Sequence, residues 1–373
     1  MRLDSNESPF DFPAALKERA LDELRKTRFN RYPQGLALSL KAALAGNLGV
    51  SSDSLVLGNG LDEVIQMILL AFGPGRRVVV PVPSFSEYSE RALVAGARVL
   101  QVPLTREFDL DVDGVVAGAT AAGADPCLIF ICNPHNPSGK LFARDAIEAI
   151  LKDTSAMVIV DEAYAEFAGC TCLNLLPAHE RLVVLRTLSK AFGLAGVRVG
   201  CAVAREDLAA ELSRVRQTFN MDSLSLVVAR IAVEDSGYVR DNVSAVLTER
   251  SRVFQELAAI PGIAPFPSRA NFVLFRTAGF AVRVWERLHS EGIALRRFAR
   301  DPVLSDCLRV TIGTAAENDT FLRALRGIMV SSLPVEDPEL ADDSQRAEDS
   351  RPLGNSRPLG NSRRANDGGV GDA

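Results

Sequence analysis

The segment Leu188-Ser189-Lys190-Ala191-Phe192-Gly193-Leu194-Ala195-Gly196-Val197-Arg198 is the most informative part of this chain. It follows the apolar run Leu182-Val183-Val184-Leu185, which predicts a buried strand. Lys190 therefore lies just beyond the end of a strand, among small residues. Because a Ser-Lys pair alone usually marks a surface loop, its meaning depends on the strands around it.

Two earlier apolar runs also end in polar residues. Val158-Ile159-Val160 is followed by Asp161, with Tyr164 three residues later. Leu128–Cys132 is followed by Asn133–Gly139, a turn composed largely of Asn, Pro and Gly. The carboxyl ends of parallel strands meet at one edge of a sheet, where open α/β folds bind their ligands. We therefore expect the following side chains to converge: Lys190, Asp161, Tyr164, Asn136 and Arg198.

The converging side chains match the needs of one cofactor, pyridoxal 5′-phosphate. Lys190 supplies an amine for a Schiff base, and Asp161 supplies an acid for the ring nitrogen. Tyr164 and Asn136 supply donors for the ring oxygen, and Arg198 supplies a cation for the phosphate. The competing interpretations are a surface lysine and an aspartate that only caps the following segment. The combination favours the cofactor site.

A second anion-binding feature lies earlier in the chain. Leu55-Val56-Leu57 predicts a strand, Gly58-Asn59-Gly60 a turn, and Leu61-Asp62-Glu63 the first turn of a helix. Free backbone N–H groups at such a helix start can hold a phosphate. An ordinary capped helix is the alternative, since acidic residues favour first turns in any case.

Three motifs together identify a resemblance. They are Asn-Pro-x-Asn-Pro-Ser-Gly, Val-Asp-Glu-Ala-Tyr and Arg-Thr-Leu-Ser-Lys-Ala-Phe-Gly-Leu-Ala-Gly-x-Arg. They resemble the fold-type I pyridoxal-phosphate aminotransferases and, within class II, the histidinol-phosphate aminotransferases. The resemblance runs from about Leu3 to about Val330. It implies an α/β fold, with a large domain built on a mostly parallel sheet and a smaller α+β domain.

The resemblance also implies an activity. The enzyme would convert L-histidinol phosphate and 2-oxoglutarate to imidazole acetol phosphate and L-glutamate, a step of histidine biosynthesis. A small-molecule amino donor and a 2-oxo acid would react in alternate halves of a ping-pong cycle, through the Schiff base at Lys190. The catalytic residues would be Lys190, Asp161 and Tyr164.

Further binding residues follow from the resemblance alone. The cofactor would also contact Leu61, Asp62, Phe85, Asn136, Ser189 and Arg198, together with Tyr32 of a neighbouring subunit, which makes a homodimer with shared active sites. The substrate would contact Arg309, Arg296, Asn136 and Tyr32. Two positions depart from the family pattern. Phe85 stands where the family usually has Tyr, and Thr218 stands where it has Pro.

Composition sets limits on the function. The 373 residues are 47% hydrophobic and 24% charged, with a net charge of −5, and they show no dense basic stripe. We therefore expect no nucleic acid as partner. We also expect no membrane span and a cytoplasmic location, since no long apolar run occurs. The three histidines are far apart in sequence and the six cysteines have no CxxC spacing, so we expect no metal site.

The predicted domain organisation has four parts. Residues 1–30 form an N-terminal arm that joins the small domain, 31–250 form the large cofactor-binding domain, and 251–332 form the small domain. Residues 333–373 are rich in polar and charged residues and repeat Arg-Pro-Leu-Gly-Asn-Ser, so we expect a disordered tail. Helices are expected over 13–26, 109–122, 238–258, 282–291 and 317–330.

Three other functions remain open at this stage. Threonine-phosphate decarboxylases and aromatic amino-acid aminotransferases share most of the motifs. Release of carbon dioxide from phosphothreonine would identify the former. A non-catalytic regulatory module that binds the cofactor is the alternative from another class. It would carry a DNA-binding segment, and neither end of this chain has the pattern or the charge for one.

Overall fold

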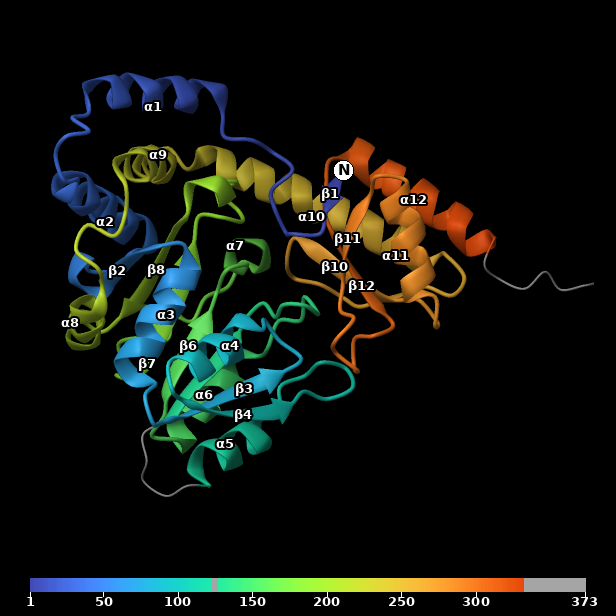
Figure 1. Ribbon diagram of the computed structural model, residues 1–373, viewed down its shortest axis with the longest axis horizontal. Coiled ribbons are helices and arrows are strands. Elements are labelled where there is room, and N and C mark those ends of the chain that lie inside the picture. Colours follow the sequence, from blue (N-terminus) through green and yellow to red (C-terminus); the bar gives the residue numbers. More distant parts are fainter. Residues whose placement is uncertain (122–126, 332–373) are drawn as a thin grey trace, which may run out of the picture. The chain divides into compact units, whose positions relative to one another are not determined.

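The computed structural model describes residues 1–121 and 127–331 (Figure 1). The predicted tail, 333–373, lies outside the described residues. Two β-sheets organise the described part of the chain.

The larger sheet has seven strands. In spatial order they are β2 (Leu55–Asn59), β8 (Val199–Ala204), β7 (Leu182–Thr187), β6 (Met157–Asp161), β5 (Cys127–Cys132), β3 (Arg77–Val82) and β4 (Arg98–Pro103). β8 runs antiparallel to both of its neighbours, and all other neighbours are parallel. The predicted α/β class with a mostly parallel sheet is thereby confirmed. β5, β6 and β7 lie side by side, so their carboxyl ends share one edge.

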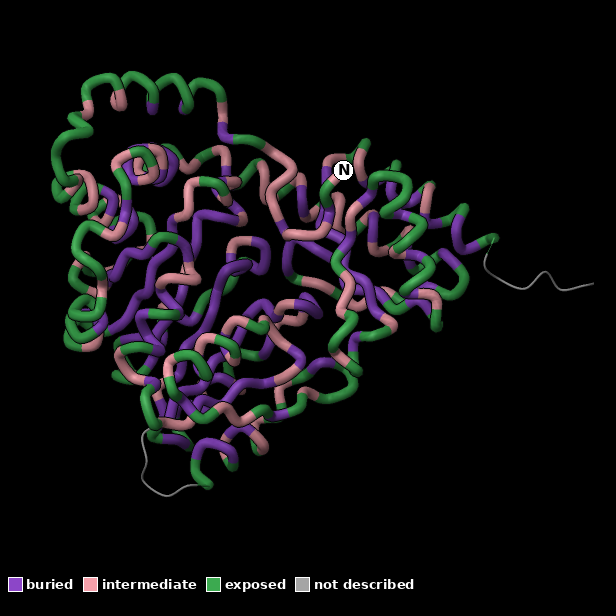
Figure 2. Tube along the Cα trace, viewed as in Figure 1, coloured by how far each residue is buried: buried purple, intermediate pink, exposed green. Residues whose placement is uncertain are grey.

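Helices cover both faces of this sheet. Alternate residues of each strand point to opposite faces, and both sets are apolar, which explains why these strands have continuous apolar sequences. One face packs on α3 (Leu61–Phe72), α4 (Glu87–Val94) and α8 (Glu206–Val215). The other packs on α2 (Gln34–Leu48), α5 (Val112–Thr120), α6 (Arg144–Asp153) and α9 (Ser223–Glu234). Figure 2 shows the strands as the buried centre of this layered arrangement.

The smaller sheet joins the two ends of the described chain. Its order is β1 (Arg2–Leu3), β11 (Ala294–Arg297), β12 (Cys307–Thr311), β10 (Phe272–Arg276) and β9 (Ala264–Pro265). β1 is parallel to β11, and the other pairs are antiparallel. Helices α10 (Gly237–Ala258), α11 (Ala281–Ser290) and α12 (Ala315–Val330) pack beside it. α10 runs through residue 250, and the division of the chain there into two domains stays a prediction.

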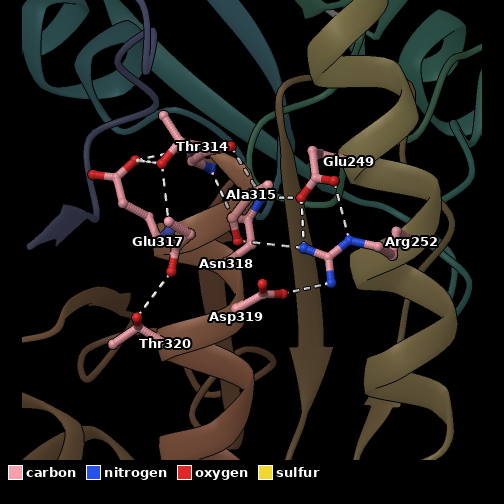
Figure 3. A network of polar contacts seen from close by, with 10 residues as sticks. Glu249, Arg252, Thr314, Ala315, Glu317, Asn318, Asp319 and Thr320 are labelled. Atoms are coloured by element: carbon pink, nitrogen blue, oxygen red, sulfur yellow. Dashed lines mark hydrogen bonds and ion pairs between the residues drawn. The ribbon is translucent and has the colours of Figure 1, made fainter.

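A polar network fixes the connection between β12 and α12 (Figure 3). The Thr314 hydroxyl accepts the Glu317 N–H at 3.3 Å, and Glu317 Oε2 accepts the Thr314 N–H at 2.8 Å, which is a capping box. Asn318 is fully buried and donates to Glu249 Oε2 of α10 at 2.8 Å. Arg252 pairs with the same glutamate. The start of α12 is therefore held against α10.

The expected helices occur with small shifts at their ends. The first is α1 (Ala14–Lys26), which packs on α9, and α10, α11 and α12 begin within two residues of their predicted starts. The helix expected over 109–122 spans only Val112–Thr120, because Asp111 caps it by accepting the Gly114 N–H at 3.0 Å. Within residues 1–121 and 127–331, no helix combines the length and apolar character needed to cross a bilayer.

Candidate active site

A cavity of about 170 Å³ lies where β5, β6 and β7 end and α3 begins. Nine of the predicted site residues line it, namely Leu61, Asp62, Phe85, Asn136, Asp161, Tyr164, Ser189, Lys190 and Arg198. These residues come from five segments that are far apart in sequence. The parallel arrangement of β5, β6 and β7 brings three of the segments together, as expected from the strand pattern.

Asp161 is the last residue of β6 and is 4% exposed. Its Oδ1 accepts the Ala163 N–H at 3.0 Å, and its Oδ2 accepts the Tyr88 hydroxyl at 2.6 Å. Burial raises the pKa of this carboxyl, while the hydrogen bonds from Tyr88 and Ala163 oppose the rise. A positively charged group in the cavity would favour the ionised form further.

Lys190 follows β7 by three residues, and its amine is partly buried at the cavity wall. Its Nζ donates to the carbonyl oxygen of Ser5 at 3.1 Å. Burial lowers the pKa of Lys190 to about 8, and the neighbouring guanidinium of Arg309 contributes to the decrease. About a tenth of this amine is therefore neutral at pH 7, far more than for an unperturbed lysine, and a neutral amine can act as a nucleophile or a base.

One end of the cavity is cationic and contacts the start of α3. Arg198 Nη2 lies 3.1 Å from Asp62 Oδ2 in the first turn of that helix. Gly60 caps the helix with φ of +81°, and a Cβ at this position would overlap the Arg198 guanidinium. Glycine thus lets the arginine lie close to the helix start. A phosphate group would fit at this end of the cavity, where the N-terminus of α3, the Arg198 guanidinium and Ser189 offer hydrogen-bond donors and positive charge.

The N-terminal arm, a term kept from here on for residues 3–9, contacts Lys190, Tyr164 and Arg309. Arg309 of β12 is 6% exposed, and it donates to Asn136 Oδ1 and, at 2.8 Å, to the carbonyl oxygen of Asp4. Its Nε is buried and has no hydrogen-bond partner among the described residues. Burial lowers the pKa of Arg309 to about 10. No carboxylate pairs with it within the described part of the chain, so its charge is available to an anionic ligand.

Three predicted residues do not line the cavity. Tyr32 is 77% exposed and stacks on Phe219, with ring centroids 4.3 Å apart. Arg309 reaches the cavity wall only through Asn136. Arg296 is exposed on β11, directly across from Arg309 in the sheet.

Sequence reasoning missed two buried residues that touch the site. Tyr88 donates to Asp161, as described above, and Asn6 Nδ2 donates to the Tyr164 hydroxyl at 2.9 Å. Tyr88 and Ala92 lie four residues apart on the buried face of α4. A tyrosine on an apolar helix face needs a partner for its hydroxyl, and this signal could have pointed to a buried acceptor. Asn6 begins the segment Asn6-Glu7-Ser8-Pro9, which resembles an Asn-Glu-x-Pro arm over the active site in the family, but the pattern does not identify Tyr164 as its partner.

The arrangement can hold a flat, phosphorylated cofactor. Lys190, Asp161 and Arg198 supply an amine, a carboxylate and a cation around one cavity, and Phe85 supplies an aromatic face. Among the described residues, no group of three or more His, Cys, Asp or Glu side chains is arranged to hold a metal ion. The donor set therefore fits the predicted pyridoxal 5′-phosphate.

Comparison with known proteins gives the class. The sequence model of the family described as aminotransferase class I and II matches residues 1–325. The chain belongs to the class I and II aminotransferases. Within that class, the histidinol-phosphate aminotransferase of Thermoanaerobacter pseudethanolicus is 38% identical over 332 residues, which cover 88% of this chain and 93% of that protein. The resemblance predicted from the motifs is thereby confirmed.

Solved structures agree with this result. The histidinol-phosphate aminotransferase of Sinorhizobium meliloti, in complex with pyridoxal-5′-phosphate, matches with a TM-score of 0.81 and 27% identity over 89% of this chain and 91% of that one. The L-threonine-O-3-phosphate decarboxylase of Porphyromonas gingivalis shares the fold, with a TM-score of 0.75 and 20% identity over 88% of this chain and 99% of that one.

Proposed function

We propose that this enzyme transfers the amino group of L-histidinol phosphate to 2-oxoglutarate, giving imidazole acetol phosphate and L-glutamate, with pyridoxal 5′-phosphate as cofactor. The proposal places the reaction in histidine biosynthesis. Its support is the 38% identity to a histidinol-phosphate aminotransferase over most of both chains, together with a cavity whose side chains fit the cofactor.

The residues around the cavity divide the task of holding the cofactor. Lys190 would anchor it through the amine, and Asp161 would pair with its ring nitrogen. Tyr164 and Asn136 would hydrogen-bond the ring oxygen, and Phe85 would supply an aromatic face for the ring. Leu61, Asp62, Ser189 and Arg198 would hold the phosphate. When bound, the cofactor supplies a carbonyl that takes up the substrate amine and a ring that withdraws electrons from the substrate α-carbon.

The chemistry of the chain's own groups is proton transfer and anion binding. With the cofactor bound, Lys190 Nζ would accept and return the proton of the substrate α-carbon, and its lowered pKa suits an amine that acts as a base. Asp161, in its ionised form, would pair with the ring nitrogen. Arg309 binds the α-carboxylate of glutamate, and Arg296 beside it helps to bind the substrate phosphate. Both anions are thus bound by one pair of neighbouring strands.

One observation carries the proposal: Lys190 and Asp161 line the same cavity of about 170 Å³. The test is to load purified protein with the cofactor and add L-histidinol phosphate without an acceptor. The visible absorption of the cofactor should be lost, and it should return when 2-oxoglutarate is added. Lys190→Ala should abolish turnover, whereas Lys152→Ala, which removes an exposed lysine of α6, should not.

Other results would give other functions. If glutamate, but not L-histidinol phosphate, abolished the visible absorption of the cofactor, the protein would still be an aminotransferase, but L-histidinol phosphate would be excluded as its amino donor. Carbon dioxide release from phosphothreonine would identify a decarboxylase, and a preference for phenylalanine or tyrosine an aromatic aminotransferase. Multiple turnovers by Lys190→Ala would contradict the role given to this amine.

We also propose a homodimer in which Tyr32 reaches the cofactor phosphate of the other subunit. The support is an exposed apolar surface around this residue, where Phe29 is 67%, Tyr32 77% and Leu38 60% exposed. Such a patch is expected to be covered by a partner.

A mixing experiment tests the shared site. Lys190→Ala should be inactive and Tyr32→Ala should be impaired at limiting cofactor. After the two variants are unfolded and refolded together, mixed dimers should recover activity, because one of their two sites has both native residues. The absence of recovery would mean that Tyr32 does not act across the interface.

The cytoplasm is the compartment that we propose for this enzyme. All six cysteines are free thiols, and five of them are buried. Unpaired thiols are typical of a reducing compartment.

A further inference from the structure

Tyr88 is a buried tyrosine that the proposed chemistry leaves without a role. It lies on α4, it is 0% exposed, and its hydroxyl donates to Asp161 Oδ2 at 2.6 Å. The two residues are 73 positions apart in sequence, so the contact is a product of the fold. The Tyr88 ring stacks on Phe130, with centroids 5.1 Å apart, and meets Phe85 edge-on at 5.5 Å. These rings fix the position of the hydroxyl.

The hydrogen bonds of Asp161 restrain its carboxylate in two places. The Ala163 N–H binds Oδ1 and the Tyr88 hydroxyl binds Oδ2. A single bond would leave the group free to turn about the Cβ–Cγ axis, whereas two bonds on different oxygens fix its plane. Each oxygen still has a free lone pair, since one hydrogen bond uses only part of its accepting capacity.

The same hydroxyl also affects the charge of Asp161. Burial opposes ionisation of this carboxyl, and the Tyr88 hydrogen bond is the largest effect that favours the ionised form. The hydroxyl itself remains protonated, because burial and the neighbouring carboxylate raise the pKa of Tyr88 well above its usual range. Tyr88 is therefore a permanent donor to Asp161.

We propose that Tyr88 is a positioning residue that orients Asp161 and keeps it ionised for the ring nitrogen of the cofactor. This inference rests on the proposed cofactor. Without the Tyr88 hydroxyl, Asp161 would lose the strongest interaction that favours its ionised form, and it would hold the proton of the ring nitrogen less firmly in place on the ring. The ring then withdraws electrons from the substrate less effectively, and the pair binds less tightly.

The test is the variant Tyr88→Phe, which keeps the ring and removes the oxygen. Apoprotein is reconstituted with pyridoxal 5′-phosphate labelled with 15N in the ring. The wild-type signal should be that of a protonated nitrogen, and the Tyr88→Phe signal should shift towards the unprotonated value. The dissociation constant of the cofactor should rise about tenfold, which corresponds to about 1.4 kcal/mol.

A double-mutant cycle shows whether Tyr88 acts through Asp161. In an Asp161→Asn background there is no carboxylate to orient, so adding Tyr88→Phe should change the 15N signal and the affinity little. An equal effect of Tyr88→Phe in both backgrounds would overturn the inference. Tyr238→Phe is the matched control, because it removes another tyrosine hydroxyl, one that donates to the Phe192 carbonyl at 3.0 Å and lies outside the cavity.

The outcomes separate this inference from the proposed function. Wild-type protein that binds no cofactor would overturn the proposed function. Wild-type protein that binds it, with a Tyr88→Phe variant of unchanged signal and affinity, would overturn only the role of Tyr88. Circular dichroism of the apoproteins checks folding. Should Tyr88→Phe fail to fold, Tyr88→His, which keeps a ring and a donor, decides the question by preserving or losing the protonated signal.

Discussion

Replacing Asn6 with alanine should release the N-terminal arm from the active site. The Asn6 side chain donates to the Tyr164 hydroxyl at 2.9 Å and accepts from the Thr311 hydroxyl at 3.3 Å. Asn6 is 2% exposed, and its φ of 53° lies in the left-handed region. Asparagine tolerates this conformation much better than alanine does. The substitution therefore removes two contacts and adds backbone strain.

The expected magnitude follows from these contacts. Each buried hydrogen bond contributes about 0.5–1.5 kcal/mol, and the left-handed conformation costs alanine about 1 kcal/mol. The combined loss is about 2–4 kcal/mol, which corresponds to roughly a 30- to 700-fold increase in the open population of the arm. The arm contributes the carbonyls that contact Lys190 and Arg309. The KM for the amino donor should therefore rise as well.

Amide hydrogen exchange measured by mass spectrometry is the suitable assay. Peptides from the arm should exchange faster in Asn6→Ala, while peptides from β6 and β7 should not change. Asn6→Gly is the matched control, because glycine lacks the side chain but adopts the left-handed conformation freely. It should be less severe than alanine by about 1 kcal/mol. Wild-type exchange rates in both variants would refute the idea that Asn6 holds the arm.

Two further substitutions test the electrostatics of the structure. Burial lowers the pKa of Lys190 from 10.5 to about 8, so between these pH values the folded cofactor-free protein binds fewer protons than the unfolded chain. The free energy of unfolding should therefore rise with pH in this window, and more steeply for the wild-type protein than for Lys190→Met. Equal slopes for the two proteins would contradict the lowered pKa. Arg186 pairs with Glu162 at 3.0 Å and Glu166 at 2.6 Å. Arg186→Met leaves the buried Glu162 without a positively charged partner and should lower the free energy of unfolding, measured in urea, by about 3–5 kcal/mol. Adding Glu162→Gln to this variant should recover part of the lost stability. No recovery would show that the two residues are not coupled.

The central strands of the fold could be predicted because both of their faces are buried. Continuous apolar runs such as Leu128–Cys132 and Leu182–Leu185 are readable without any long-range information. The pairing of β1 with β11 could not be located in this way, since two residues of strand carry no periodicity. The helix expected over 109–122 is shorter in the structure, because a local apolar pattern does not show that Asp111 caps its start.

The residues of the candidate site also differ in whether a local sequence pattern identifies them. Lys190 and Asp161 are predictable because each lies at or just beyond the carboxyl end of a recognisable strand. Tyr88 and Asn6 act through contacts 73 and 158 residues away, and such contacts depend on the packing of α4 and of the arm, which local spacing does not encode. Tyr32 is exposed in one subunit, so its assigned contact with a cofactor phosphate stays a prediction.

The pairing of β1 with β11 has a consequence for how the enzyme is made. Arg2 and Leu3 pair with Ala294 and Leu295. The first strand to be synthesised can therefore pair only after most of the chain has been translated. The seven-stranded sheet, complete at residue 204, can collapse much earlier. The residues that line the cavity, all between 61 and 198, can therefore assemble before the arm is anchored, and we expect the contacts of the arm with Lys190 and Tyr164 to form only after residue 294 has been translated.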